Sequence, residues 1–186
     1  MGDVPGAMSS HSCAALGGAL FLLDGGDFWK YNVVANAWST VDVPGIKLTA
    51  GRMVNVRGLI WVHRPHVSPA ELRVFDPEQG SWRDVSLHVR GASPPTRMRH
   101  GCAVADDRFY VFGGRGKDSV DLNDLWVLNA ADGYLRPHAE LVWTELSGGL
   151  LGAAPVARSD MGMAALGGRM YIFGGEAPSG SGRHLP

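Results

Sequence analysis

The sequence predicts an all-β protein built from repeated four-stranded antiparallel sheets. Of its 186 residues, 26 are Gly and 11 are Pro, which is about 20% against a usual level of roughly 12%. The chain also holds six Trp residues. Frequent turn residues together with many aromatic residues are typical of short strands joined by tight loops. A fifteen-residue pattern that recurs four times along the chain indicates how many such sheets to expect.

The recurring pattern aligns over all fifteen positions without a gap, and its copies begin at His11, Gly51, His100 and Met161. Each copy has an apolar run, two turn residues, and a second apolar run that contains one aromatic residue. Two apolar runs separated by two or three turn residues form a β-hairpin. The four copies therefore predict hairpins at 12–25, 52–65, 101–114 and 162–175.

Two further strands follow each of the first three hairpins. The third strand alternates apolar residues and ends in Asn or Asp, which commonly start turns. A fourth short strand then opens with a Trp, at Trp38, Trp82 and Trp143. We expect these three indoles to be structurally equivalent and largely buried. The third repeat carries about eight extra residues between its third and fourth strands, within Ala130 to Val142.

The third position of the pattern holds a sulfur residue in every copy: Cys13, Met53, Cys102 and Met163. One interpretation is a thiol–thioether set for a metal or for redox chemistry. The favoured interpretation is a repeated core position that accepts soft, medium-sized side chains. Two cysteines are too few for a disulfide scaffold, and their places in the first and third repeats predict that they lie too far apart to bond.

The segments YVFGG, at 110–114, and YIFGG, at 171–175, resemble the double-glycine signature of Kelch repeats. The resemblance covers almost the whole chain and is most specific in the third and fourth repeats. It is weaker in the first two repeats, where Asp24-Gly25 and Arg64-Pro65 occupy the glycine positions. The structural residues that the resemblance implies are Gly113, Gly114, Trp126, Trp143, Arg158, Gly174 and Gly175.

A resemblance to Kelch repeats implies a β-propeller, in which each blade is a four-stranded sheet and the blades surround a central channel. We expect a partial Kelch-type propeller forming a single domain over 1–186, with three four-stranded blades and half of a fourth. Propellers typically have four to eight blades. We therefore expect either a longer Kelch protein that supplies the remaining blades, or completion by a second copy. The expected blade limits are approximately 8–47, 48–96, 97–157 and 158–186.

The charge balance argues against two classes of partner. With 17 Lys and Arg against 18 Asp and Glu, the formal net charge is -1. This balance favours neither a nucleic acid nor an anionic membrane surface as a partner. No apolar run reaches the roughly 18 residues of a membrane-spanning helix, and the apolar stretch 13–23 lacks the basic region of a signal peptide. A cytoplasmic location is the default expectation.

We expect no catalysis, no cofactor and no metal. His63 and His66 could be read as a metal pair, but no carboxylate or Cys lies near them in sequence, so solvated histidines are favoured. The chain has no G-x-S-x-G elbow. Its glycine-rich stretch 113–119 leads into a strand, so no helix N-terminus is available there to hold a phosphate. The Kelch resemblance leaves one alternative open, a fragment of a propeller enzyme of the copper radical oxidase or iron-dependent specifier type.

The favoured function is a non-catalytic scaffold that binds an unidentified protein partner through the loops between strands, where binding residues tend to lie. Because strands alternate in direction, the loops from second to third and from fourth to first strands share one face. We expect binding through Arg115, Lys117 and Asp118 on that face. The third repeat's insertion, with Arg136 and His138, is the second candidate and lies on the opposite face.

Three further arginines are expected on the first of these faces: Arg90, Arg97 and Arg158. Arg97 and Arg158 stand just before first strands. A structural role for these two, anchoring neighbouring turns, is favoured over a role in binding.

Overall fold

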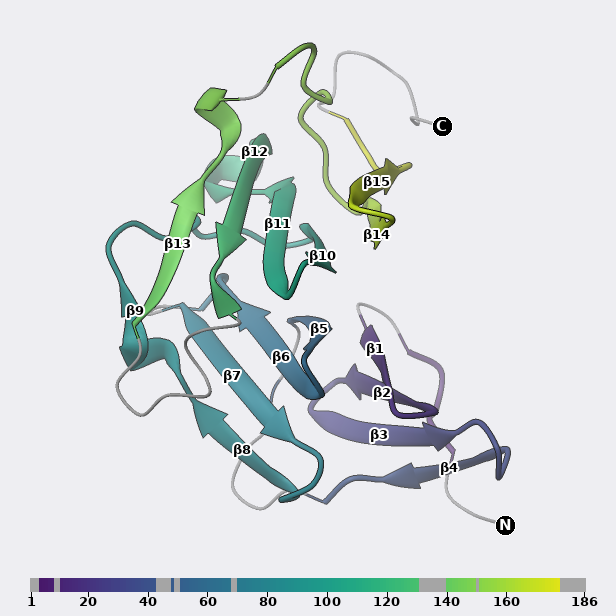
Figure 1. Cartoon of the computed structure of the whole chain (residues 1–186). Helices are drawn as coiled ribbons and strands as arrows, with labels where there is room; N and C mark the ends of the chain where they lie inside the picture. Colours follow the sequence, from purple (N-terminus) through teal and green to yellow (C-terminus); the bar gives the residue numbers. More distant parts are fainter. Residues whose placement is uncertain are drawn as a thin grey trace. The chain divides into compact units, whose positions relative to one another are not determined.

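The predicted all-β fold is confirmed by the computed structural model, in which antiparallel sheets follow one another along the chain (Figure 1). The structure describes residues 4–8, 11–42, 48, 51–67, 70–130, 140–149 and 151–177. The chain separates into two compact units, Met1–Arg64 with Glu71–Ser86 and Pro65–Ala70 with Leu87–Pro186. The first unit holds two four-stranded sheets, and the second holds a five-stranded sheet and a hairpin.

Blade one is the first sheet, with its strands hydrogen-bonded in chain order. The strands are β1 (Ser12–Leu16), β2 (Ala19–Asp24), β3 (Asp27–Asn32) and β4 (Ala37–Thr40). The β1–β2 turn consists of Gly17 and Gly18, both at positive φ, a backbone region that glycine enters without steric penalty. The first predicted hairpin therefore forms as expected.

Blade two repeats this arrangement with β5 (Arg52–Val56), β6 (Leu59–Arg64), β7 (Glu71–Asp76) and β8 (Ser81–Asp84). Its hairpin forms although Arg64 and Pro65 replace the double glycine. A glycine that immediately precedes β5 lies against this position instead. Gly51 has a φ of +146°, and a Cβ there would lie 2.9 Å from the Arg64 Cγ. The absence of a side chain at Gly51 therefore leaves room for the Arg64 side chain.

Blades one and two pack face to face inside the first unit. The rings of Phe21 and Phe75 lie 6.0 Å apart, one from each sheet. Ser12 Oγ accepts a hydrogen bond from Met53 N at 2.8 Å. Through these contacts the two sheets share one apolar core. Its buried members are Ala14, Ala19, Phe21, Leu23, Phe28, Leu48, Met53, Ile60, Val62 and Phe75.

Blade three contains four antiparallel strands and one short parallel strand that the sequence did not predict. The strands are β10 (Gly101–Ala105), β11 (Arg108–Arg115), β12 (Asp121–Leu128), β13 (Leu141–Glu145) and β9 (Val89–Arg90). Their order in the sheet is β10-β11-β12-β13-β9. β9 pairs in parallel with β13, so it covers the outer edge of the sheet. Three-residue 3₁₀ turns, η1 (Ser86–His88), η2 (Lys117–Ser119) and η3 (Ser147–Gly149), accompany the strands.

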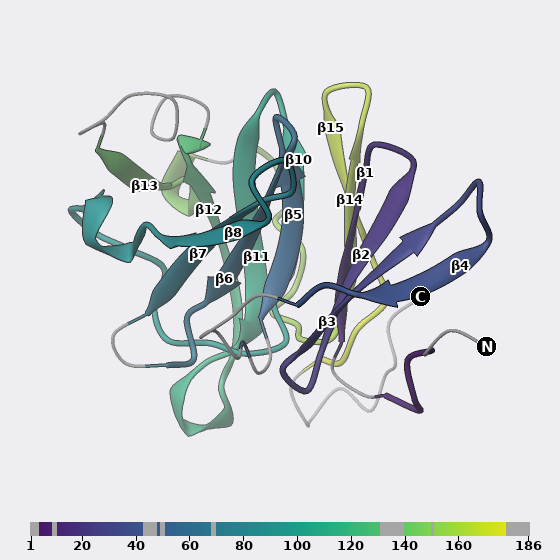
Figure 2. The same ribbon diagram turned by 90° about the horizontal axis from the view of Figure 1, so that it is seen from below.

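The hairpin of blade four, β14 (Gly162–Leu166) and β15 (Arg169–Phe173), packs against β10 of blade three (Figure 2). A Cβ built at Gly101 would lie 3.0 Å from the Met163 Cβ. All four predicted hairpins are therefore confirmed. Among the described residues, no helix is long and apolar enough to cross a membrane.

The three repeated Trp residues occupy equivalent positions, because each pairs with the same place on its third strand. Trp38 pairs with Tyr31, Trp82 with Phe75, and Trp143 with Leu128. Trp143 is buried, but Trp38 and Trp82 are only half-buried. The expected equivalence of the three indoles is therefore confirmed, and burial is complete only for Trp143. The strands of Trp38 and Trp82 form the outer edges of their sheets, whereas β9 flanks β13.

The repeated sulfur position is buried to different degrees in the four blades. Met53 is buried, Cys102 and Met163 are half-buried, and Cys13 is exposed. Both cysteines are free thiols. The interpretation as a core position therefore holds fully for Met53 and fails for Cys13.

Candidate interaction site

The loop between β11 and β12 presents two of the three predicted binding residues to solvent. Lys117 and Asp118 are both exposed and lie in the 3₁₀ turn η2. The Gly116 N–H donates to the carbonyl of Val120 at 2.8 Å, which closes the loop on itself. Asp118 and Ser119 both have positive φ. The loop is thus a compact turn that displays adjacent opposite charges.

Arg115, the third predicted residue, is engaged within the protein. Its Nε donates to Asp121 Oδ1 at 3.0 Å, and its Nη2 donates to Glu176 Oε2 at 3.3 Å. The hydrogen bond to Asp121 raises the pKa of Arg115, which burial alone would lower. Arg115 therefore clamps the base of the loop and ties blade three to blade four.

A second ion pair between blades three and four lies at an equivalent pair of repeat positions. Arg99 Nη1 donates to Asp160 Oδ2 at 3.0 Å, and the Asp160 N–H donates to the Arg99 carbonyl at 2.9 Å. Arg99 and Asp160 follow the anchoring arginines by two residues, and Arg115 and Glu176 follow the double glycines by one. Blade three is basic at both positions and blade four is acidic. Sequence reasoning missed these pairs, although comparing the repeats position by position would have found them.

Arg97 lies at the centre of the network that supports this loop, and its side chain is fully buried. Its Nη1 and Nη2 donate to the two oxygens of Asp124 at 2.7 and 2.6 Å, a bidentate pair, and charge-assisted pairs of this geometry are the strong ones. Nη1 also donates to the Gly113 carbonyl at 3.0 Å. Trp126 Nε1 donates to Asp124 Oδ2 at 2.6 Å. Arg97 therefore has a structural role.

Arg158 repeats part of this arrangement in blade four. Its Nη1 donates to the Gly174 carbonyl at 3.0 Å, as Arg97 does to Gly113. Each contact is to the first residue of a double glycine. The favoured structural role of Arg158 thus agrees with its contacts.

The contacts with Arg97 and Trp126 change the pKa of the Asp124 carboxylate. Burial by itself would raise its pKa, but the hydrogen bonds and charge of Arg97, together with the Trp126 indole, more than offset burial. The pKa of Asp124 is therefore lowered from its ordinary value, and the carboxylate stays ionised beside the buried guanidinium.

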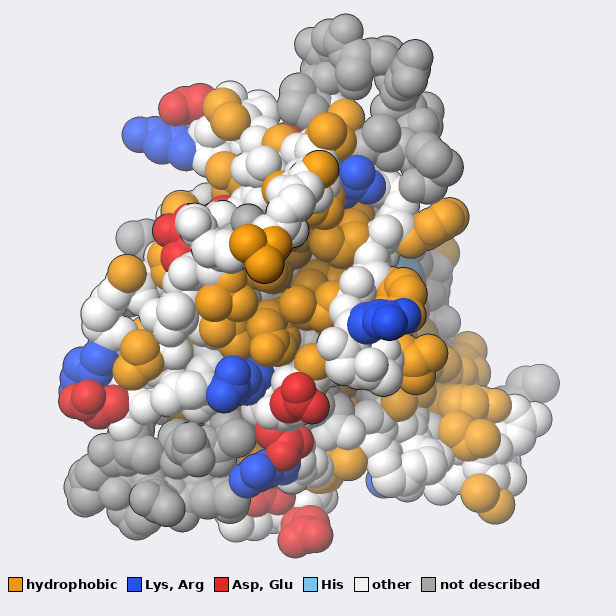
Figure 3. Space-filling view, turned by 45° about the horizontal axis from the view of Figure 1, so that its top comes forward, with side chains coloured by type: hydrophobic (Ala, Val, Ile, Leu, Met, Phe, Trp, Pro, Cys, Tyr) orange, Lys and Arg blue, Asp and Glu red, His pale blue; other side chains and the backbone are white. Residues whose placement is uncertain are grey.

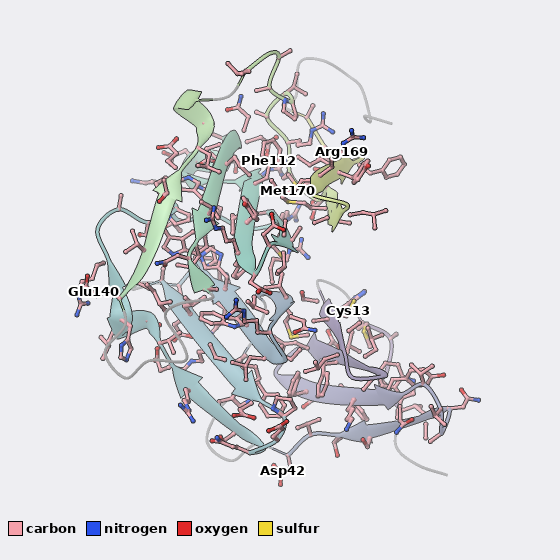
Figure 4. All side chains as sticks on the ribbon, viewed as in Figure 1. Cys13, Asp42, Phe112, Glu140, Arg169 and Met170 are labelled. Atoms are coloured by element: carbon pink, nitrogen blue, oxygen red, sulfur yellow. The ribbon has the colours of Figure 1, made fainter. Side chains whose placement is uncertain are left out.

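Arg90 does not lie on the face where it was expected. It pairs with Val142 at the start of β13, while Arg115 lies beside Asp121 at the start of the antiparallel neighbour β12. Arg90 is therefore at the opposite end of the sheet, with its Nε 3.6 Å from Glu140 Oε1. Glu140 is labelled in Figure 4, just before β13. The unpredicted strand β9 causes this difference. Arg136 and His138, in the insertion, lie outside the described residues.

The first unit has an apolar depression of about 500 Å³ around the β1–β2 turn. Tyr31 forms part of its wall and donates its hydroxyl to Asn36 Oδ1 at 2.7 Å. Asn55 reaches it from blade two and donates to the Ala15 carbonyl at 2.9 Å. Val34 lies nearby in sequence and is exposed. No sequence signal pointed to this hollow.

The described residues contain no group of three or more His, Cys, Asp or Glu side chains placed to hold a metal ion. His63 is buried in β6 opposite Leu72, which differs from the solvated loop position expected for it. On the face in Figure 3, charged side chains of both signs are scattered and form no single patch. This distribution agrees with the formal net charge of -1.

Comparison with known proteins relates this chain to one family. The KLHDC2/KLHL20/DRC7 Kelch-repeats domain matches residues 60–185. The Rab9 effector protein with kelch motifs from Xenopus laevis is 33% identical over 129 residues, covering 66% of this chain and 32% of that protein. The flagellar outer arm dynein alpha chain from Chlamydomonas reinhardtii is 35% identical over 111 residues, covering 59% of this chain and 2% of that protein.

An enzyme is also among the similar proteins. The N-(sulfonatooxy)prop-2-enimidothioate sulfolyase from Thlaspi arvense is 25% identical over 136 residues, covering 64% of this chain and 39% of that protein. The chain spans less than half the length of each of these three relatives.

Proposed function

Because the chain belongs to the family of KLHDC2/KLHL20/DRC7 Kelch-repeat domains, we propose that it is a non-catalytic scaffold that binds a protein partner through its inter-strand loops. The β11–β12 loop is the proposed contact. Rigid frames that carry loops commonly place binding residues on those loops.

The observation that carries this proposal is the contrast between the tip and the base of the loop. At the tip, Lys117 and Asp118 are exposed. At the base, Arg115 pairs with Asp121 and Glu176. A tip of two opposite charges on a fixed base loses little conformational freedom on binding, which favours recognition of a complementary charged pair on a protein surface.

The relatives' names agree with this class of function without identifying the partner. They include a Rab9 effector and a Rho GTPase-activating protein, gacHH, from Dictyostelium discoideum. Both names describe proteins that act on or through other proteins. For this chain we propose only the class of function, which is the binding of another protein.

The test is affinity capture with the purified chain as bait, comparing wild type with a Lys117→Glu, Asp118→Lys double variant. Inverting both charges should reduce specifically captured protein about tenfold, since misplaced like charges disfavour docking. The matched control is Glu78→Lys, at an exposed position in the β7–β8 turn. Equal capture by all three proteins would exclude this loop as the contact.

The similarity to a sulfolyase supports a second candidate function, in which the chain is a fragment of a Kelch-like propeller enzyme. Such an enzyme of the copper radical oxidase or iron-dependent specifier type would require a metal. Metal analysis of the purified protein separates the two proposals, because stoichiometric copper or iron would favour the enzyme. A metal-free protein that still captures a partner favours the scaffold.

A further inference from the structure

The pattern Arg-x-x-Ser occurs twice in this chain, at Arg83–Ser86 and at Arg90–Ser93. An arginine three residues before a serine is the spacing that arginine-directed kinases read, because carboxylates of the kinase bind the guanidinium. Only the second serine is followed by a proline, Pro94. The two serines lie in different surroundings, which separate an occupied hydroxyl from an available one.

The hydroxyl of Ser86 is occupied within the folded chain. Ser86 is half-buried in the 3₁₀ turn η1. Its Oγ accepts a hydrogen bond from the Leu72 N–H at 2.8 Å and donates to the Leu72 carbonyl at 3.3 Å. The Ser86 N–H donates to Asp84 Oδ1 at 3.0 Å. A kinase would have to break these bonds to reach the hydroxyl, so the first copy of the pattern is closed to it.

The hydroxyl of Ser93 is available. Ser93 is exposed, in the stretch between β9 and β10 that has no regular secondary structure. In the part of the chain that the structure describes, no hydrogen bond involves the backbone of 92–94 or the Ser93 hydroxyl. A residue that precedes proline favours extended backbone. Although Pro94 is buried, this segment can enter a kinase cleft without losing a backbone hydrogen bond.

The Arg90 side chain is also within reach of a kinase. It is 57% exposed, and its Nε lies 3.6 Å from Oε1 of Glu140, which is 65% exposed. Its Nη1 donates to the carbonyls of Leu87 and Val89 at 2.6 and 3.2 Å. Exposed ion pairs contribute little to stability, so carboxylates of a kinase can replace Glu140 beside this guanidinium.

We propose that Ser93 is a phosphorylation site for a serine kinase that reads an arginine three residues before the acceptor and a proline directly after it. The phosphoryl donor is ATP. The bond between the γ-phosphorus and the oxygen that leaves with ADP breaks, and a bond forms from that phosphorus to Ser93 Oγ. The hydroxyl proton passes to the catalytic Asp of the kinase. This site lies outside the β11–β12 loop, so it does not depend on the proposed binding function.

Phosphorylation of the intact purified chain tests the site. The probe is an active kinase of the dual-specificity tyrosine-regulated class, which reads this arginine and proline pattern, supplied with ATP and Mg²⁺. Mass spectrometry should show the gain of one phosphoryl group, and fragmentation should place it on Ser93. Ser93→Ala should abolish the gain. Transfer to Ser86 instead, or an unmodified chain in a reaction where the kinase modifies a peptide of the same pattern, would overturn the proposal.

Two matched variants test how the site is recognised. Arg90→Gln removes the guanidinium that the kinase reads and should slow phosphorylation at least about tenfold, since hydrogen bonds between charged groups are lost. Arg83→Gln makes the same change at the other copy of the pattern, where Arg83 is also exposed, and should leave the rate unchanged. Both variants should keep the wild-type urea midpoint, so that a slower transfer reports recognition and not unfolding. Equal rates for the two variants would contradict recognition through Arg90.

Discussion

Single side chains hold blade three together through a buried charge. The Arg97 side chain has 0% exposure and makes a bidentate pair with Asp124. Removing one partner of a buried ion pair leaves the other charge unpaired in a medium of low polarity, which costs far more than the pair itself contributes. The network therefore stabilises the strands that carry the β11–β12 loop.

We predict that stability falls in acid through Asp124. Its pKa is lower in the folded chain than its ordinary value of 3.8. In the window between the two values the unfolded chain binds the additional proton, so the free energy of unfolding decreases as pH falls. This contribution is fully present above the ordinary value and disappears below the lowered one.

Chemical denaturation at pH 7 and through the acid range checks this prediction. Asp124→Asn should cost about 3–5 kcal/mol at pH 7 and should show a shallower fall in acid than wild type. Asp118→Asn, at an exposed position, serves as the control and should follow the wild-type curve. If the free energy of unfolding of wild type and of Asp124→Asn fell by the same amount in acid, the prediction would be contradicted.

We also predict that Gly113→Val destabilises the chain. Gly113 has a φ of +56°, and a Cβ there would lie 2.8 Å from the Arg158 carbonyl oxygen. A branched side chain in that backbone region adds strain of about 1–3 kcal/mol, and the clash adds to it. Gly148→Val is the control, because a Cβ at Gly148 meets nothing within 4 Å. Equal urea midpoints for Gly113→Val and Gly148→Val would disprove the requirement for glycine at position 113.

Strands in equivalent positions differ in whether a further strand flanks them and in how deeply their Trp residues are buried. The fourth strand ends its sheet in blades one and two, but β9 flanks it in blade three. Trp143 accordingly packs on Phe109 with ring centroids 5.8 Å apart and is buried, whereas Trp38 is half-buried against Tyr31. We therefore expect Trp143 and Trp38, at the same register, to contribute differently to the free energy of unfolding.

We expect Trp143→Ala to cost about 3–5 kcal/mol, the usual range for a buried aromatic. Trp38→Ala should cost roughly half as much, because less apolar area leaves water at that site. Urea denaturation of the two variants measures the difference. A Trp38→Ala variant as unstable as Trp143→Ala would show that edge strands anchor the sheets equally.

At the scale of the whole molecule, the chain has two compact units, each with buried apolar residues of its own. Phe75 belongs to the core of the first unit, and Phe109 is buried in the second. Regions with separate cores can open separately, so stability need not be uniform along the chain.

We predict that Phe75→Ala mainly loosens the first unit. The cavity should cost about 3–5 kcal/mol locally, and amide exchange should accelerate in β2, β3 and β5–β8. Amides of β11 and β12 should keep most of their protection. Hydrogen exchange read out by mass spectrometry provides the measurement, and uniform acceleration along both units would show one cooperative structure instead.

The sequence alone determined the strand pattern of this protein. Apolar alternation and turn pairs are local signals, because side chains alternate across a strand and turns require particular backbone angles. They located all four hairpins and the equivalent registers of Trp38, Trp82 and Trp143. They also identified Arg97 and Arg158 as anchors through their repeated place before first strands.

Only the tertiary structure decided which of these residues meet. The parallel pairing of β9 with β13 places Arg90 at the far end of its sheet. Trp143 is buried, with its ring against Phe109, whereas Trp38 is half-buried. The engagement of Arg115 with Glu176 joins residues 61 positions apart. Such outcomes depend on packing between segments distant in sequence, where burial and charge pairing are settled by neighbours that no local pattern specifies.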